Sequence, residues 1–170
     1  MPQNTNANLT FLKKSIDKFI ELGAKRGGYE FHMEIKDAAF ADVSYLVFST
    51  QIPQLSRYAI EQTGHMGLTS REQGIPETTH EITVQFQETV QGHIFEMMLS
   101  WYRKKEYKDV VLKLRGENDS TGGGNGKQFT LKRCFLRSDP QDLSVEDTTQ
   151  GFRPNVTLIY SYVEEFFKSS

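Results

Sequence analysis

The spacing of hydrophobic residues changes several times along the chain, and each change marks the boundary of an expected element. Alternating apolar and polar residues predict half-buried strands over 29–36 and 81–87, because successive side chains of a strand point to opposite faces. Further strand-like segments, rich in β-branched and aromatic residues and bounded by turn formers, are 44–52, 55–62, 109–114, 127–136 and 155–166.

Two segments instead repeat their apolar residues at three- and four-residue steps, which indicates helices. The first covers 9–22, with Asn8 or Thr10 as its cap, Gly23 as its end and an apolar stripe expected to pack on a core. That stripe consists of Leu12, Ile16, Phe19 and Ile20. The second helix follows Gly92 directly after a strand, and its expected core anchors are Ile94, Phe95, Met98 and Trp101.

These elements predict a mainly β or α+β fold. About seven strands, mostly neighbours in sequence, favour an antiparallel β-sandwich or split barrel with a flanking α-helix. Alternating βαβ units are missing from the pattern, which argues against a doubly wound sheet. The polar residues 1–8 have no periodicity and are expected to form a flexible arm, followed by one domain over 9–170.

Composition excludes some classes of protein. The net charge of −2 argues against a dedicated nucleic-acid binder, which needs an excess of Lys and Arg. Cys134 is the single cysteine, so an intrachain disulfide is impossible and a reducing compartment is expected. No apolar run is long enough for a signal peptide or a membrane span, so we expect the chain to fold in the cytoplasm.

Candidate chemistry is sparse. The Gly-rich stretch before Lys127 departs from a phosphate-binding loop, because Thr121 stands where Gly is required and Gln128 where Ser or Thr is required. A strand follows it instead of a helix, so we interpret it as a mobile hairpin loop. Cys134 lies within a strand pattern and is expected to be a buried, inert thiol.

The histidines do not form a metal motif. His32 with Glu34, and His93 with Glu96, each supply two ligand types, and two ligands do not make a site. No nucleophile elbow or paired catalytic carboxylates are found either. We therefore predict no catalytic, cofactor-binding or metal-binding residues, and no enzymatic activity.

Three segments stand out by their order and spacing: the strand and helix of 81–102, the strand LVFSTQIPQL, and the ending CFLRSDPQDLSVEDTTQGFRPNVTLIYSYVEEF. Together they resemble the tail tube proteins of contractile-tailed bacteriophages. The order and spacing of these pieces carry the resemblance, which covers about 29–165 at weak letter-by-letter identity. The longer first helix and the GGGNG loop depart from the family pattern.

The resemblance implies an assembly as well as a fold. Hexameric rings would share an inner β-barrel and stack into a tube, in the tail of a virion assembled in the host cytoplasm. The implied partners are further copies of the chain, a contractile sheath protein, a tape-measure protein, and baseplate and tail-terminator proteins. Double-stranded DNA would pass through without sequence-specific binding, and no membrane is involved.

The resemblance also suggests roles for two polar segments. Candidate lumen-facing residues are Arg57, Glu61, Gln85 and Gln87, for which an outer solvated face is the open alternative. The polar stretch 63–79 is longer than a connector needs and is either functional or partly β-structured. Its candidate contacts between rings are Thr69, Ser70, Arg71, Glu72, Gln73 and Glu77.

Other functions remain open at this stage. A tube-initiating or tube-terminating ring, or a secretion tube of the type VI kind, would share the fold. A ligand-binding β-barrel outside any tube is the alternative from another class, although no converging polar cluster supports it.

Overall fold

The computed structural model describes residues 5–21, 27–114, 127–141, 143 and 151–167. The chain divides into two compact units, Met1–Glu30 and Phe31–Ser170. The first unit holds helix α1 (Thr5–Glu21), which begins within the segment expected to be a flexible arm. Leu12, Ile16, Phe19 and Ile20 are each more than half exposed, so the expected packing of this stripe is not observed.

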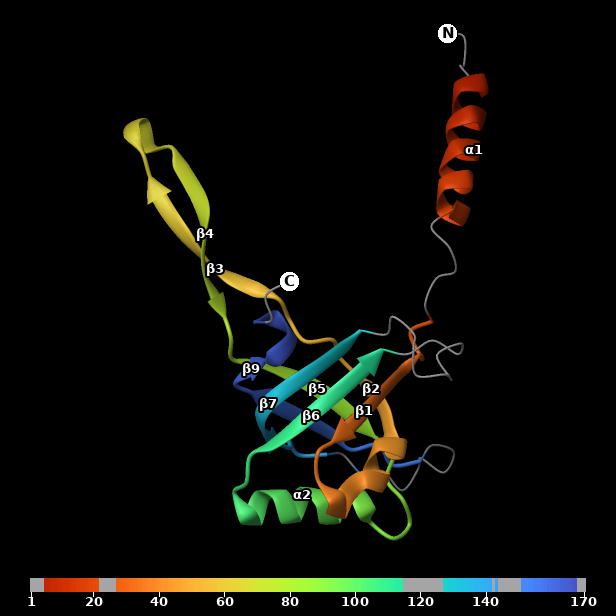
Figure 1. The fold of residues 1–170 in the computed structure, drawn as a ribbon, viewed down its shortest axis with the longest axis vertical. Helices are drawn as coiled ribbons and strands as arrows, with labels where there is room; N and C mark the ends of the chain where they lie inside the picture. The colour runs from red at the N-terminus through yellow and green to blue at the C-terminus, as the bar shows by residue number, and fades with distance from the viewer. Residues whose placement is uncertain (1–4, 22–26, 115–126, 142, 144–150, 168–170) are drawn as a thin grey trace. The chain divides into compact units, whose positions relative to one another are not determined.

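The second unit is built on antiparallel strands, coloured from orange to blue in Figure 1. Its strands are β1 (Phe31–Ile35), β2 (Val47–Thr50), β3 (Ser56–Thr63), β4 (Thr69–Glu77), β5 (His80–Phe86), β6 (Lys108–Leu114), β7 (Gln128–Arg137), β8 (Asn155–Tyr160) and β9 (Tyr162–Val163). Its helices are α2 (His93–Lys104) and the 3-10 segments η1 (Ala38–Leu46), η2 (His65–Gly67) and η4 (Glu164–Phe166). The stretch 44–52 therefore divides between η1 and β2, because Asp37 caps a 3-10 segment that runs to Leu46.

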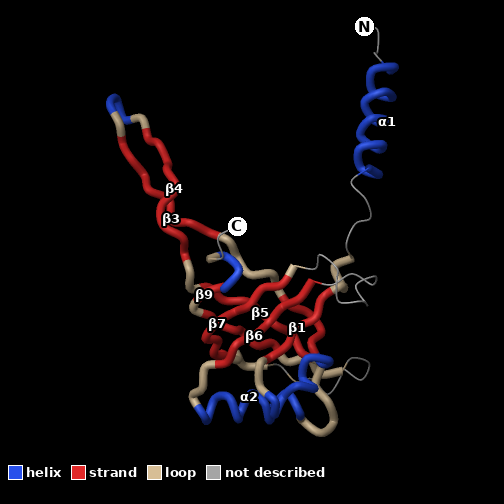
Figure 2. The backbone as a smooth tube through the Cα atoms, in the orientation of Figure 1, coloured by secondary structure: helices blue, strands red, loops and turns tan. Residues whose placement is uncertain are grey.

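Seven strands form one sheet in the order β1-β6-β7-β8-β5-β2, with β9 also paired to β7. The sheet folds into two layers because β7 changes partner along its length. Its Gln128–Cys134 part pairs with β6, and Phe135–Arg137 pairs with β8. Figure 2 shows these strands in red, crossing one another in the two layers. This architecture confirms the predicted mainly β, α+β class.

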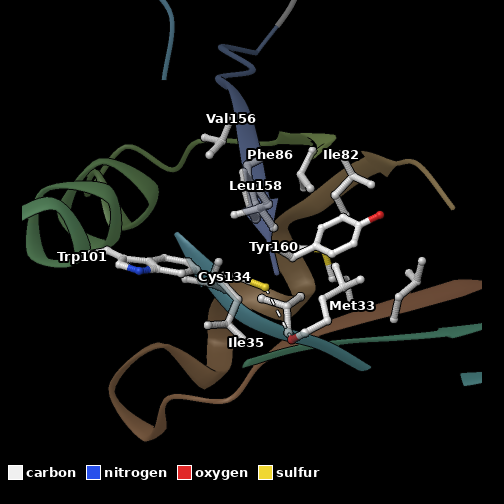
Figure 3. Packing of buried hydrophobic residues seen from close by; sticks show 14 of the residues in the cluster. Met33, Ile35, Ile82, Phe86, Trp101, Cys134, Val156, Leu158 and Tyr160 are labelled. Carbon is white, nitrogen blue, oxygen red and sulfur yellow. Dashed lines mark hydrogen bonds between the residues drawn. The ribbon is translucent and has the colours of Figure 1, made fainter. Parts of the chain in front are cut away.

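The core lies between the two layers. Ile82, Val84 and Phe86 are buried on β5, as their alternation predicts, and they meet Val156, Leu158 and Tyr160 of β8. Figure 3 shows Cys134, Ile35 and Met33 gathered in the same cluster, with Trp101 entering from α2. The segment 155–166, expected to be one strand, divides into β8, β9 and η4, because the chain bends at Ser161; Val163 is buried after the bend and Tyr162 is exposed.

Helix α2 lies across one end of the layers (Figure 1). Ile94, Met97 and Trp101 are its buried residues, and Met98 is partly buried against the core. Phe95 is 59% exposed and is not a core anchor, which corrects the prediction. The error has a geometric cause: Ile94, Met97 and Trp101 follow one helical face, and Phe95 lies about 100° around from Ile94.

Candidate assembly surfaces

Strands β3 and β4 form a two-stranded hairpin that pairs with no other strand among the described residues. The register runs from Ser56 opposite Glu77 to Thr63 opposite Thr69. A bulge lies between Arg57 and Ala59, where the chain passes Gly74. A side chain at Gly74 would bring its Cβ to 2.8 Å from the carbonyl oxygen of Tyr58, so the bulge needs glycine there.

The hairpin exposes apolar side chains and has no core of its own. Tyr58 and Ile60 are about half exposed, and Leu68, Ile75 and Met66 are 72–87% exposed. An isolated two-stranded hairpin is marginally stable in water, and its outer edges are open to pairing with another chain. These features are typical of an arm that is completed by a partner.

All six candidate ring-to-ring residues lie on β4, since the polar stretch 63–79 proves to be mostly strand. Arg71 Nη2 forms a 2.7 Å ion pair with Oε1 of Glu61, a candidate for the lumen. Gln62 similarly donates from Nε2 to Glu72 Oε2 at 3.3 Å. The structure thus places residues assigned to two different surfaces side by side on one hairpin.

The four lumen candidates, in contrast, lie on two separate sheets. Arg57 and Glu61 belong to the hairpin, where Arg57 Nη1 donates to the carbonyl oxygen of Gly74 at 3.3 Å. Gln85 lies on the outer face of β5, half-buried, and Gln87 follows the end of that strand and is exposed. Alternation alone could not reveal that β3 leaves the main sheet.

The base of the hairpin is joined to the main sheet by His80, the first residue of β5. Its Nε2 lies 3.1 Å from Ser56 Oγ and 3.1 Å from the carbonyl oxygen of Glu77. Ser56 Oγ in turn donates to Glu77 Oε2 at 2.7 Å. These bonds tie the two ends of the hairpin to one another and to β5. No motif or spacing in the sequence predicts this role for His80.

A cavity of about 530 Å³ opens beside this junction, lined by His80, Arg57, Tyr160 and Phe166 among others. The Tyr160 hydroxyl is buried without a hydrogen-bond partner among the described residues. Burial raises the pKa of Tyr160, and the nearby backbone of Gln54 offsets part of that rise.

Glu88 explains why strand β5 passes so directly into α2. Its Oε1 accepts from the backbone N–H of Ile94 at 3.0 Å, and its Oε2 accepts from that of Phe95 at 2.9 Å. The first turn of a helix leaves such N–H groups unsatisfied and favours negative charge nearby. The acidic residue six positions before the first buried residue of the helix was the signal that the sequence analysis missed.

Beneath α2, Lys108 is nearly buried and is paired with Asp37 and with Glu106. Burial alone would lower the pKa of Lys108, but the hydrogen bonds to these two carboxylates outweigh it and raise that pKa. The Lys108 ammonium and the backbone N–H of Ala39 together lower the pKa of Asp37. Since Asp37 also caps η1, this pair links η1 to β6.

The bend of β7 is stabilised by Asp109. Its Oδ1 accepts from the backbone N–H of Arg133 at 3.1 Å, and its Oδ2 accepts from Lys132 Nζ at 2.8 Å. Burial would raise the pKa of Asp109, and these hydrogen bonds reverse the effect and lower it. Two residues of β7, Lys132 and Arg133, lie opposite the single residue Asp109 of β6. This two-against-one pairing is a β-bulge.

No cluster of three or more His, Cys, Asp or Glu side chains that could hold a metal ion is found in the described part of the chain. Cys134 is fully buried as predicted, its Sγ donates to the carbonyl oxygen of Leu131, and burial raises its pKa to about 12. The Gly-rich loop, predicted to be mobile, lies outside the described residues. None of the described helices is long and apolar enough to cross a membrane.

No family model matches the sequence, and no curated protein matches it. Solved structures do share its fold. A chain of the PVC sheath/tube terminator of an extracellular contractile injection system has a TM-score of 0.60 at 18% identity, covering 84% of this chain and 96% of that chain.

Two further solved structures agree. The PVC sheath-tube complex matches with a TM-score of 0.55 at 17% identity, over 86% of this chain and 94% of that chain. The tube-terminating cap of the anti-feeding prophage matches with a TM-score of 0.60 at 17% identity, over 83% of this chain and 90% of that chain. At such identities the likeness shows the fold.

Proposed function

We propose that this chain is a non-enzymatic structural subunit of the tube of a contractile apparatus, either a phage tail or a related injection system. The observation that carries the proposal is the β3–β4 hairpin, an exposed and partly apolar arm on a subunit that otherwise has a complete core. The fold shared with a tube terminator, a sheath-tube complex and a tube-terminating cap supports it.

In this proposal the two terminal strands of the main sheet join neighbouring subunits. β1 and β2 stand at the two ends of the strand order, and each has a single partner among the described strands. Such edges invite pairing with another chain, and closing them into a ring across subunits removes the hazard of uncontrolled association. Hexameric rings that stack head to tail would then build a tube.

The polar residues take their roles from this arrangement. The face of β5 that carries Glu81, Thr83 and Gln85 turns away from the core, so it is available to line the channel with Gln87. The β4 residues contact the adjacent ring, and Arg57 and Glu61 lie where the hairpin approaches the channel. Sheath, tape-measure, baseplate and terminator proteins are the proposed partners, and DNA passes through without base-specific contacts.

A tube-terminating ring is the second candidate. It is favoured by the two neighbours with a TM-score of 0.60, which are a sheath/tube terminator and a tube-terminating cap. In this candidate the subunit would keep the same fold and hairpin, but one face of its ring would not accept another ring. The two candidates therefore differ in stacking and not in the subunit.

Negative-stain electron microscopy of the purified full-length chain tests the proposal. Stacked rings or long tubes support a tube subunit, and single rings that do not stack support a terminator. Monodisperse monomers at every concentration tested would contradict both.

A further inference from the structure

The C-terminal end of α2 and the bend of β7 meet in an exposed cluster of aromatic and cationic side chains. We define the basic–aromatic patch by Arg103, Lys105, Tyr107, Arg133 and Phe135, all of which are exposed. Tyr107 and Phe135 pack edge to face with ring centroids 6.2 Å apart. The guanidinium of Arg133 lies 4.8 Å from the centre of the Tyr107 ring, a cation–π contact.

Both rings line a groove of about 430 Å³ together with Trp101 and Tyr102. The cations Arg103 and Lys105 line the same groove. Glu106 is the acidic residue of its lining, and its carboxylate is already engaged by Lys108 Nζ at 3.3 Å. In the described part of the chain, the side chains of Arg103, Lys105 and Arg133 have no ion-pair partner.

The backbone supplies an independent observation. Lys105 has φ 52° and Arg133 has φ 55°, and both are in the left-handed region that favours glycine. Lys105 ends α2 in the position where glycine is the usual residue. Arg133 occupies the β-bulge of β7, another position where a left-handed residue is usually glycine.

Cations are thus kept at two strained positions that glycine would fill without strain, and both positions lie in the same patch. Packing does not require a particular side chain at these two exposed positions. Backbone strain that is nevertheless kept there therefore indicates a function. The chain as a whole has a net charge of −2, so this local excess of positive charge is not a consequence of composition.

We propose that the basic–aromatic patch binds an acidic segment of a partner protein. Carboxylates of the segment pair with Arg103, Lys105 and Arg133, and one apolar side chain enters the groove against Tyr107 and Phe135. A protein segment fits better than nucleic acid, because the patch is small and lies on an acidic chain. This surface is separate from the hairpin that carries the proposed assembly.

The test uses the full-length chain and a fluorescein-labelled peptide, Asp-Glu-Leu-Glu-Phe-Glu-Asp, in a fluorescence anisotropy titration. The double variant Lys105→Gly/Arg133→Gly removes two charges and the cation–π contact, so its affinity for the peptide should fall about tenfold or more. Lys105→Asn/Arg133→Asn, which also tolerates the left-handed backbone, should lose as much. The control Lys13→Gln/Lys14→Gln removes equal charge from the exposed face of α1 and should bind as the parent does.

Thermal melting separates a binding role from a structural one. The proposal expects the glycine variant to melt at the parent temperature or above it, because the left-handed strain is relieved. A lower melting temperature together with unchanged peptide binding would show that these cations stabilise the fold instead, and would overturn the proposal.

Two further probes examine the other classes of partner. A short DNA duplex and vesicles of phosphatidylserine and phosphatidylcholine should bind more weakly than the peptide and should be unaffected by the double variants. Tighter, patch-dependent binding of either probe overturns the proposal, and so does a failure of the parent chain to bind the peptide. The double variants should still form rings or tubes. If they do, a failure of the patch proposal does not affect the assembly proposal.

Discussion

Glu88 is half-buried at the turn between β5 and α2, and its carboxylate accepts backbone hydrogen bonds from Ile94, Phe95 and Thr89. Gly92, at the helix cap, has no side chain that could accept them. The side chain of Glu88, a few residues before the cap, therefore accepts the hydrogen bonds that Ser, Thr, Asp or Asn usually accepts at the cap itself.

Replacing Glu88 with Ala should lower the free energy of unfolding by about 1–2 kcal/mol, because these N–H groups lose their acceptor. Urea denaturation followed by circular dichroism measures the change. Glu96→Gln is the matched control, since Glu96 is exposed in the first turn of the same helix and should change stability little. Equal losses in both variants would rule out the capping role.

Replacing Trp101 and replacing Phe95, both on α2, should have opposite consequences for stability: a large loss and almost none. Trp101 is 2% exposed and donates from Nε1 to the carbonyl oxygen of Glu106, so Trp101→Ala should cost about 3–5 kcal/mol. Phe95→Ala should change stability by roughly 0.5 kcal/mol or less, because Phe95 is largely exposed. Thermal melts of the two variants check this, and a comparable cost for Phe95→Ala would restore it as an anchor.

The Asp37–Lys108 pair makes stability depend on pH in acid. The pKa of Asp37 is lowered in the folded chain, so its contribution is present above the unfolded pKa, about 3.9, and is lost as pH falls through the lower folded value. Asp37→Asn should cost about 1–3 kcal/mol at neutral pH and less below pH about 4. Asp42→Asn, at an exposed position of η1, is the control and should give a pH profile parallel to the parent's.

At the scale of elements, the hairpin behaves as a part separable from the core. Its two strands contact one another extensively, and its attachment rests on the bonds among Ser56, Glu77 and His80. The core residues of β5 and β8 do not depend on it. Folding of the subunit and assembly of the subunit should therefore respond differently to changes in the hairpin.

Replacing residues 60–72 with Asn-Gly tests this separation, because Ala59 and Gln73 are register partners and Asn-Gly favours a two-residue turn between them. The shortened chain should keep the parent's near-ultraviolet circular dichroism and cooperative melting, but should remain monomeric in sedimentation velocity. The control Lys18→Gln lies outside the hairpin, breaks only the exposed ion pair with Glu21 and should assemble, since such pairs contribute little. Normal assembly of the shortened chain would contradict the role of the hairpin.

The elements that could be predicted from sequence are those in which local pattern and tertiary environment agree. The alternation in β5 and β8 reports burial on one face of a sheet, and the period of α2 reports its helical state. The hairpin is harder to predict from sequence. Strand β4 is exposed on both faces, so its apolar and polar residues do not alternate. The partner switch of β7 depends on the bulge at Arg133, which no hydrophobic pattern encodes.

Polar sites were predicted less well than the fold, for the same reason. Asp109 accepts from the backbone N–H of Arg133, 24 residues away, so its spacing in sequence carries little information. Glu88 bonds to backbone N–H groups six and seven residues ahead, and His80 lies against a carbonyl three residues behind, but neither spacing belongs to the standard capping box. Met97 and Phe95 fit the apolar pattern of the helix equally well, so the sequence cannot tell which of them is a core anchor. The position of the sheet decides that Met97 faces the core. The Gly-rich loop lies outside the described residues, so its expected mobility stays a prediction.

For the whole molecule, the account separates a self-sufficient core from surfaces that need partners. The core between the two layers is complete, whereas the hairpin exposes Tyr58, Ile60 and Ile75, and the strand order ends at β1 and β2. A chain built in this way is expected to fold as a monomer and to become fully ordered in an assembly. The basic–aromatic patch adds a third surface, which we propose serves a different partner.

Cryo-electron microscopy of the assembled full-length chain tests the central claim most directly. The account predicts ring-shaped particles with rotational symmetry, in which the β3–β4 hairpin of each subunit packs its apolar side chains against another subunit. Particles in which the hairpin stays in solvent, or a chain that remains monomeric, would contradict it.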